Sequence, residues 1–395
     1  MPCLVVFSHL RWNFVFQRPQ HLLSRLARRY PVIFIEEPAR CEEAPWIELT
    51  SPCAGVQVLR PHTPVDAPGF HDDQLSLLEP MVAGWLNDQG IDDYVCWLYT
   101  PMALPILQEL EPRAVVYDCM DELSAFKGAP RQMKQRETAL MKRAQLVLTG
   151  GPGLYALKRS LHHNVLCLPS AVDARHYDAD RARSNTEAMA ASDALQGAIP
   201  HPRLGFFGVI DERLDVDLVA ALADADPRWQ IVMVGPVVKI DPASLPQRPN
   251  LHWLGQQSYE LLPQIVAGWS VCLMPFALNE STRFISPTKT LEYMAAGKPV
   301  VSTPIHDVQA MFGDLVAIAA DAPTFIAACS DALAESDLEI ELREARMKER
   351  VGEYSWDRTA ETIAAAIDAA LGAPTQRSDG SGAEAVVATT RVAAA

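Results

Sequence analysis

Short apolar runs alternate with amphipathic stretches along the first third of the chain. Each run has the length of a buried strand, and the stretches between them place leucine, alanine and methionine at helical spacing. The pattern predicts strands at 2–8, 32–35, 94–98, 114–117, 146–149 and 165–168, and helices at 18–29, 104–107 and 133–141. Strands that alternate with helices form a parallel sheet covered on both faces.

A second series of the same kind begins at residue 204. The predicted strands are 204–210, 230–234, 251–254, 271–275, 299–302 and 315–318, and the predicted helices are 214–223, 259–267, 286–296, 322–334 and 356–371. The repeated order predicts a second doubly wound domain after the first.

The segment 177–201 separates the two series, because it is rich in Asp, Ala, Ser and Arg and has no strand pattern. We therefore predict an α/β protein of two Rossmann-like, doubly wound domains, at 1–176 and 202–354, joined by a linker or hinge. Ligands bind beyond the carboxyl ends of parallel strands, so both domains are expected to face one central cleft. The tail at 373–395 has little to bury and is predicted to be disordered.

Composition narrows the classes of function. Acidic residues outnumber basic ones by 49 to 34, which gives a formal net charge of −15, so we expect no nucleic-acid partner. The N-terminal segment has no basic stretch before its apolar run, and no apolar stretch approaches the ~18 residues that span a bilayer. The cysteines are scattered without a C-x-x-C pair, which favours reduced, buried thiols. Together these features predict a cytoplasmic protein.

One segment of the second series carries the most chemical information. Ser286 followed by Pro287 is typical of a helix start, with an N-cap side chain and then proline at the first helical position. Thr288 and the backbone amides near it would then face the cleft, ready for phosphate oxygens. Lys289 opposes the helix dipole, which makes sense if an anion lies there, and Glu292 on the same face suits the hydroxyls of a ribose. The alternative is a surface helix with a stray ion pair.

This segment also carries a family resemblance. The stretch Pro-Thr-Lys-x-x-Glu-Tyr-Met-Ala-Ala-Gly-Lys-Pro-Val-Val, which begins at Pro287, resembles the nucleotide-sugar site of GT-B glycosyltransferases, especially the retaining family 4 type. The run Gly-Phe-Phe-Gly-Val-Ile-Asp-Glu-Arg at 205–213 is similar to the first strand and glycine loop of the donor domain, which implies donor contacts at Gly208 and Arg213.

The resemblance extends over most of the chain. Leu-His-Trp-Leu-Gly at 251–255 resembles the base-binding stretch, so we expect substrate contacts at Leu254, Gly255 and Tyr259. The helix at 355–372 resembles the last helix of the fold, which crosses back to the first domain. Gln-Arg-Pro-Gln-His at positions 17–21 resembles the first helix of one subgroup.

The sequence departs from the family at one position. Many members carry two glutamates eight positions apart, and the first of these falls on Phe284 here. The resemblance places that glutamate near the transferred sugar, so the contacts of the sugar stay open. The phosphate charge is expected to be met by Arg213, Lys289 and Arg283. Two of these, Arg213 and Lys289, are predicted to be catalytic.

Polar residues that follow strands of the first domain complete the candidate site. Asp118 and Asp121 come at the carboxyl end of a strand, where they would bind sugar hydroxyls or the acceptor as catalytic residues, or cap a helix. Arg11 and Trp12 follow the first strand, where an acceptor would enter. Trp12 would stack on a sugar or cover the end of the sheet, and His21 on the first helix is either a substrate contact or a buried structural histidine.

We therefore predict a glycosyltransferase that moves a sugar from a nucleoside-diphosphate sugar to a saccharide or lipid-linked acceptor, in cell-surface polysaccharide or glycolipid synthesis. The resemblance implies retention of configuration and no metal or other cofactor. The Asp-x-Asp pairs at 178–180 and 224–226 lie in a linker and at a helix end, which disfavours a metal role. A lipid-linked acceptor would bring the protein to the inner face of the membrane, with peripheral contact through the basic residues Lys127, Arg131, Lys134, Arg136, Lys142 and Arg143.

Three alternatives remain open. A GT-B epimerase would share the donor site but would need several acid or base groups around the sugar. A non-catalytic sugar-nucleotide-binding scaffold would account for the missing glutamate at Phe284. A nicotinamide oxidoreductase is disfavoured, because no strand is followed by G-x-G-x-x-G.

Overall fold

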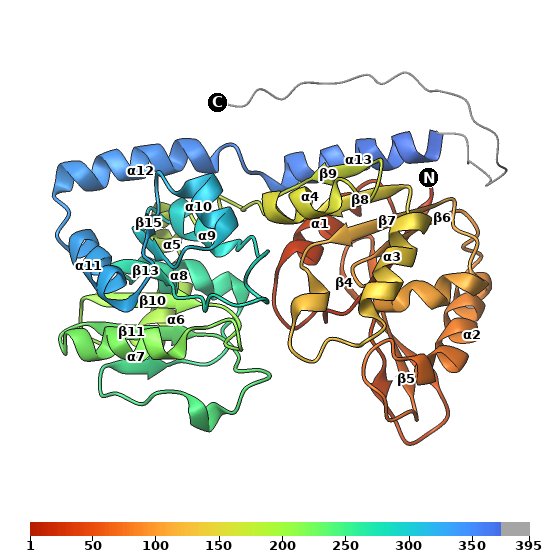
Figure 1. Cartoon of the computed structure of the whole chain (residues 1–395), viewed down its shortest axis with the longest axis horizontal. Helices are drawn as coiled ribbons and strands as arrows, with labels where there is room; N and C mark the ends of the chain where they lie inside the picture. Colours follow the sequence, from red (N-terminus) through yellow and green to blue (C-terminus); the bar gives the residue numbers. More distant parts are fainter. Residues whose placement is uncertain (373–395) are drawn as a thin grey trace.

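The computed structural model describes residues 1–372 and consists of two α/β domains, with a final helix that returns from the second domain to the first (Figure 1). This is the predicted architecture of two doubly wound units. The predicted disordered tail at 373–395 lies outside the described residues. Within residues 1–372, no helix has both the length and the apolar character needed to cross a bilayer.

The N-terminal domain is built on a sheet with the strand order β3-β5-β2-β1-β6-β7-β8-β9. The strands from β2 to β9 along this order pair in parallel, and their buried residues form nearly continuous apolar runs, as in sheets covered on both faces. The strands are β1 (Cys3–Ser8), β2 (Val32–Glu36), β3 (Ala39–Arg40), β4 (Trp46–Cys53), β5 (Val56–Thr63), β6 (Tyr94–Leu98), β7 (Ala114–Cys119), β8 (Leu146–Thr149) and β9 (Val165–Cys167).

The C-terminal domain has a smaller, wholly parallel sheet in the order β12-β11-β10-β13-β14-β15. The order runs outward in both directions from β10 and β13, so loops at the carboxyl ends of these central strands flank a topological switch point. The strands are β10 (Arg203–Phe207), β11 (Gln230–Val234), β12 (Leu251–Trp253), β13 (Val271–Met274), β14 (Val300–Ser302) and β15 (Ala317–Ile318).

Helices cover both sheets, as the alternating pattern predicts. Those of the N-terminal half are α1 (Arg18–Leu26), α2 (Asp72–Asp88), α3 (Met133–Arg143) and α4 (Pro152–Lys158), with 3₁₀ turns η1 (Pro101–Glu109) and η2 (Leu123–Ala125). Those that follow are α5 (Ala179–Ser184), α6 (Thr186–Gln196), α7 (Val216–Ala225), α8 (Leu262–Ala267), α9 (Lys289–Ala295), α10 (His306–Phe312), α11 (Ala322–Leu333), α12 (Asp337–Val351) and α13 (Trp356–Gly372), with η3 (Pro242–Ser244) and η4 (Tyr259–Leu261).

Helix α13 crosses back and lies along the N-terminal domain, as the dark blue helix in Figure 1 shows. It contacts α1, β7 and β8, and its buried residues Trp356, Ile363 and Ile367 belong to the same apolar cluster as strands of the first sheet. The phenol of Tyr30 donates a hydrogen bond to Asp368 Oδ1 at 2.9 Å. The last helix is therefore part of the core of the first domain.

The predicted linker at 177–201 is mostly helical. It forms α5 and α6, which contact α8 of the C-terminal domain. Gln196 donates to the carbonyl of Ile265 at 2.9 Å and accepts from the indole of Trp269 at 3.1 Å. The segment is thus attached to the second domain. The sequence predicted a linker or hinge here, with a short helix possible, and the role of the segment as a hinge stays a prediction. The polar, alanine-rich composition of the segment gives no clear helical pattern of apolar residues, because its short helices have few apolar positions, which pack against α8.

The prediction assigned no element between the second strand and the third, and the structure fills this gap. The antiparallel β4–β5 hairpin extends the sheet at its edge, and α2 follows it. β4 is mostly exposed, so its sequence lacks the apolar run on which the strand prediction relied. α12 was missed for a related reason, because most of its residues are charged and exposed.

Candidate functional site

A cavity of about 790 Å³ lies between the domains, with walls from both. Its lining includes loops that follow β10, β11 and β13 of the second sheet and β7 and β8 of the first. This is the location expected for two parallel sheets whose carboxyl ends face each other. The predicted residues that the structure brings together in this lining are Trp12, Asp121, Gly208, Arg213, Tyr259, Ser286, Pro287, Thr288, Lys289 and Glu292.

The start of α9 differs from the prediction. The helix begins at Lys289 rather than Ser286, and Thr288 occupies the N-cap position without a side-chain cap hydrogen bond. Ser286 is instead held by its carbonyl, which accepts a 2.8 Å hydrogen bond from the Ser170 hydroxyl of the N-terminal half. The residues before the helix are extended wall residues of the cavity, so the expected N-cap role of Ser286 is wrong.

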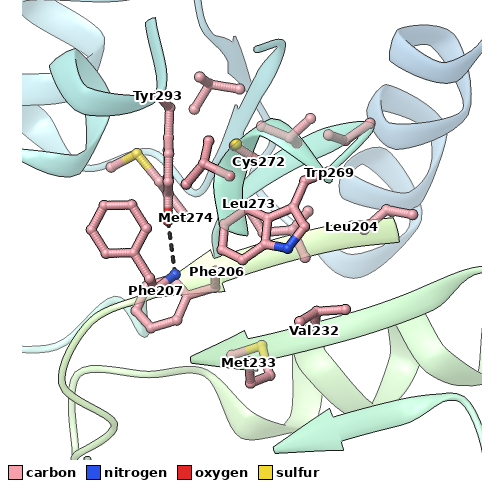
Figure 2. Close-up of a cluster of buried hydrophobic side chains, with 14 of the residues drawn as sticks. Leu204, Phe206, Phe207, Val232, Met233, Trp269, Cys272, Leu273, Met274 and Tyr293 are labelled. Carbon is pink, nitrogen blue, oxygen red and sulfur yellow. Dashed lines mark hydrogen bonds between the residues drawn. The ribbon is translucent and has the colours of Figure 1, made fainter. Parts of the chain in front are cut away.

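Gly208 allows Lys289 to reach the cavity. Its φ of +145° disfavours any side chain, and a Cβ there would lie 2.1 Å from Lys289 Cε. The preceding Phe207 is fixed by its backbone N–H, which donates to the Tyr293 hydroxyl at 3.0 Å (Figure 2). Tyr293 belongs to α9, so this bond couples the glycine loop to the helix that carries Lys289 and Glu292.

Lys289, which is partly buried, and Glu292, which is buried, are neighbouring side chains of opposite charge on α9. Burial lowers the pKa of Lys289, an effect that the neighbouring Glu292 opposes. Burial raises the pKa of Glu292 to about 7, although Lys289 works in the other direction. The Thr288 hydroxyl donates to Glu292 Oε2 at 3.4 Å. Loss of contact with water therefore disfavours the charged form of both groups. An anionic ligand at Lys289, with hydroxyl donors at Glu292, would stabilise both charges.

Arg213 is held in place by two kinds of contact. Asp211 accepts from Nε at 2.9 Å and from Nη2 at 2.7 Å, which leaves Nη1 for a ligand. The guanidinium carbon also lies 5.6 Å from the ring centre of Phe126, which comes from the opposite domain. Arg213 is therefore a preorganised cation that lines the cavity.

Asp121 is the acidic residue of the N-terminal domain that lines the cavity. Burial raises its pKa to about 6, while Arg213 and Arg18 lower it. At neutral pH it carries a negative charge that faces cations from both domains. This arrangement suits the predicted contact with sugar hydroxyls, which stays a prediction.

Asp118 lies outside the cavity lining and pairs with Arg18, so the structure does not bring it together with the other predicted site residues. The side chain is fully buried, and both carboxylate oxygens accept from Nε of Arg18, at 3.2 and 3.1 Å. Arg18 itself lines the cavity and was missed. The signal in the sequence was an arginine at the first position of a helix whose following residues are otherwise buried.

Three further residues of the N-terminal domain have structural roles. Arg11 lies outside the lining and pairs with Glu36 at 3.1 Å. The Trp12 ring is buried edge-on against Phe34, with ring centres 5.1 Å apart, so it covers the end of the sheet at the cavity wall, and its contact with a sugar stays a prediction. His21 is buried and stacks on Trp356 of α13 at 4.8 Å; burial lowers its pKa to about 3.

Some predicted contacts of the second domain also fall outside the lining. Leu254 and Gly255 lie behind it, and Gln256, Gln257 and Ser258 form the wall instead. Arg283 is mostly exposed over the ring of Phe284 at 5.1 Å and lies outside the lining, so its phosphate contact stays a prediction. Phe284 packs against the apolar cluster of the N-terminal domain, which removes its side chain from any polar contact with a sugar.

The acidic pairs considered for metal binding are engaged elsewhere. Asp224 and Asp226 pair with Arg248 and Arg228, and Asp178 caps α5. Across residues 1–372 no group of three or more His, Cys, Asp or Glu side chains is placed to hold a metal ion.

Gly208→Ala is expected to displace the Lys289 side chain, because the added methyl group would occupy the place of Cε. We expect nucleotide affinity to fall by roughly tenfold or more, as for loss of one charge-assisted hydrogen bond. Isothermal titration with the nucleotide that the wild type binds would measure this loss. Gly90→Ala is the matched control, because Gly90 also has a positive φ, of +65°, but has nothing within 4 Å of the added methyl. Equal affinities for the two variants would contradict the expected collision.

Comparison with known protein families finds a match within the second domain. Residues 201–335 match the family described as Glycosyl transferases group 1. The chain carries a group 1 glycosyltransferase domain. This domain holds Gly208, Arg213, Lys289 and Glu292, so the part of the cavity predicted for the nucleotide sugar lies within it.

A relative in Bacillus subtilis (strain 168) is similar over a longer stretch. It is TuaH, provisionally named a teichuronic acid biosynthesis glycosyltransferase, and it is 26% identical over 254 residues. The match covers 61% of this chain and 64% of TuaH, so less than two thirds of that relative is spanned. The predicted kinship with glycosyltransferases is confirmed by this relative and by the group 1 domain.

Solved structures extend the likeness to nearly the whole chain. A sucrose-phosphate synthase from Thermosynechococcus elongatus superposes with a TM-score of 0.72 at 14% identity, over 93% of this chain and 99% of the other. Anabaena Alr3699/HepE, solved with UDP and glucose, gives a TM-score of 0.66 at 13% identity, over 93% and 100% of the two chains. At such identities the likeness shows the fold, and the predicted GT-B fold is confirmed.

Proposed function

We propose that the protein is a glycosyltransferase that takes a sugar from a nucleoside-diphosphate donor and transfers it to a saccharide or lipid-linked acceptor. The observation that carries the proposal is the set of Lys289, Glu292 and Arg213 on the group 1 domain, which lines one cavity with Asp121 of the other domain. The set combines cations for a diphosphate with a carboxylate for a diol, which few ligands other than a nucleoside-diphosphate sugar would satisfy together.

In this proposal, charged side chains recognise two parts of the donor, its ribose and its diphosphate. Glu292, close to Tyr259 and Tyr177, accepts the ribose hydroxyls, and the base lies along the wall formed by residues 256–259. The diphosphate lies between Lys289 and Arg213. The neighbouring Gly208 has no side chain, which lets the backbone approach the phosphates closely.

Transfer leaves negative charge on the nucleoside diphosphate as the bond to the sugar breaks. Lys289 and Arg213 are already fixed by their neighbours, so they stabilise this charge without reorganisation. Asp121 holds a hydroxyl of the sugar or the acceptor from the other side. Retention of configuration is part of the proposal and is supported by the resemblance of residues 287–301 to retaining enzymes.

Contacts between the domains would keep water from the donor. Phe16 of the first domain stacks on Tyr259 of the second with ring centres 4.5 Å apart, and Gln256 donates to the carbonyl of Phe14. Both contacts lie at the cavity wall. A closed cleft protects an activated sugar from hydrolysis.

The acceptor class is proposed from the relative. TuaH is named for teichuronic acid biosynthesis, which supports an acceptor that is a growing saccharide or its lipid-linked form. In the lipid-linked case the protein would work at the inner face of the membrane. The basic face of α3 is a weak anchor, because Arg136 is held by Asp72 and by the carbonyl of Met102 at 3.0 Å.

The proposal is tested by thermal unfolding with UDP, GDP, ADP, dTDP and their sugars. A ligand present at 100 times its dissociation constant adds roughly 2.7 kcal/mol of stability. We expect one base to raise the melting temperature clearly, and release of that nucleoside diphosphate to require an acceptor. A shift without acceptor-dependent release would favour the scaffold, and no shift with any nucleotide would contradict the donor site.

A further inference from the structure

The guanidinium of Arg18 is the feature of the cavity that the donor site leaves unexplained. Arg18 is the first residue of α1, its side chain is 3% exposed, and it lines the cavity from the N-terminal domain. Lys289 and Arg213 belong to the other domain, so Arg18 adds a third cation from another wall.

The hydrogen bonds of Arg18 occupy only part of its guanidinium. Nε donates to both carboxylate oxygens of Asp118, and Nη1 donates to the carbonyl of Leu168 at 2.9 Å. Nη2 is buried and has no hydrogen-bond partner among the described residues. An ion pair made only for stability would use the parallel two-nitrogen geometry, as Arg213 does with Asp211. In Arg18, by contrast, the Asp118 carboxylate accepts hydrogen bonds from Nε alone, and Nη2 makes no bond to it.

A buried nitrogen without an acceptor costs free energy unless a ligand completes it. Asp118 and Leu168 fix the guanidinium at two points, so the free nitrogen is already oriented when a ligand arrives. Guanidinium nitrogens bind phosphate and carboxylate oxygens more strongly than neutral acceptors.

We propose that Arg18 binds an anionic oxygen of the substrate through Nη2, from the N-terminal wall of the cavity, and that Asp118 is its positioning residue. The inference rests on the proposed donor site for the occupant of the opposite wall. The anion is either the distal phosphate of the donor or a phosphate or carboxylate on the acceptor, and the two sources predict different binding data.

The test compares two variants that share a neutral side chain at position 118. Asp118→Asn keeps an oxygen for Nε, whereas Arg18→Met with Asp118→Asn removes the whole pair, a change that buried ion pairs tolerate well. The difference between them isolates Arg18. Thermal unfolding and circular dichroism establish that both are folded, and calorimetric titration then measures the nucleoside diphosphate and monophosphate that the wild type binds.

If Arg18 meets the distal phosphate of the donor, the double variant binds the diphosphate about tenfold or more weakly than Asp118→Asn, with monophosphate affinity equal in the two. If Arg18 instead binds an anionic group of the acceptor, the nucleoside diphosphate and the monophosphate each bind the two variants with equal affinity. Inorganic phosphate, titrated into protein already saturated with the nucleoside diphosphate, then binds Asp118→Asn at least about tenfold more tightly than the double variant.

Equal binding of the nucleotides and of inorganic phosphate by the two variants would overturn the role of Arg18. Failure of the proposed donor site looks different, because the wild type itself would then bind no nucleoside diphosphate. In that case inorganic phosphate alone still tests Arg18, with the same comparison between the two variants.

Discussion

Lys289→Met is expected to lower turnover by roughly 10²- to 10³-fold, the usual cost of removing one preorganised group that stabilises developing charge. Methionine keeps the length and apolar character of the stem, which packs over Gly208 and the ring of Phe206. The variant should remain folded, because burial disfavours the charge that is removed, and Glu292, whose pKa burial raises to about 7, can take up a proton once Lys289 is gone. Acceptor-dependent release of the nucleoside diphosphate, measured at saturating donor, is the appropriate assay.

Lys348→Met is the matched control for this change, since Lys348 is an exposed lysine on α12, outside the cavity lining. It should turn over like the wild type. If both variants kept wild-type turnover, the cation over Gly208 would have no part in the reaction, and the leaving-group assignment would have to be abandoned.

Glu292→Ala is expected to weaken nucleoside-diphosphate binding by roughly 100-fold, because two hydrogen bonds from the ribose to a charged acceptor are lost. Glu349→Ala, an exposed glutamate on α12, is the control. Titration with the matching 2′,3′-dideoxynucleoside diphosphate gives an independent check, since a ligand without the diol should bind wild type and Glu292→Ala alike. A large loss for that ligand too would place Glu292 elsewhere than at the ribose.

The same carboxylate predicts a pH dependence. Burial raises the pKa of Glu292 to about 7 from an ordinary value of 4.5. The charged form is the one that accepts both hydroxyls, so nucleotide affinity should fall as the pH is lowered from about 8 to 6. Glu292→Gln should bind weakly and with a smaller fall, because its amide does not titrate, whereas Asp121, with a pKa raised to about 6, still titrates at the lower end of this range. A wild-type affinity that is flat over this range would contradict the assignment.

The sequence predicted the fold well because its evidence is local and repeated. Buried parallel strands such as β1 and β6 are continuous apolar runs, and they alternate with helices throughout. The exposed strand β4 and the charged helix α12 lack that pattern, because their positions depend on neighbours distant in the sequence rather than on their own apolar residues.

The sequence predicted some residues of the candidate site and missed others. Lys289 and Glu292 were found because one helix brings them together, so their spacing along the chain is informative. Asp118 and Arg18 are 100 positions apart, and nothing local shows that each is the partner of the other. A carboxylate at the end of a strand suggests chemistry whether or not an arginine from another helix already occupies it.

Helix α13 makes the N-terminal domain dependent on the far end of the chain. Trp356, Ile363 and Ile367 complete the apolar cluster of a domain whose first strand begins at Cys3. During synthesis, that domain therefore leaves the ribosome with part of its interior uncovered until the last described helix has emerged. A chain truncated after residue 355 would keep every strand of both sheets, yet the folded state of the first domain, rather than that of the second, would be destabilised.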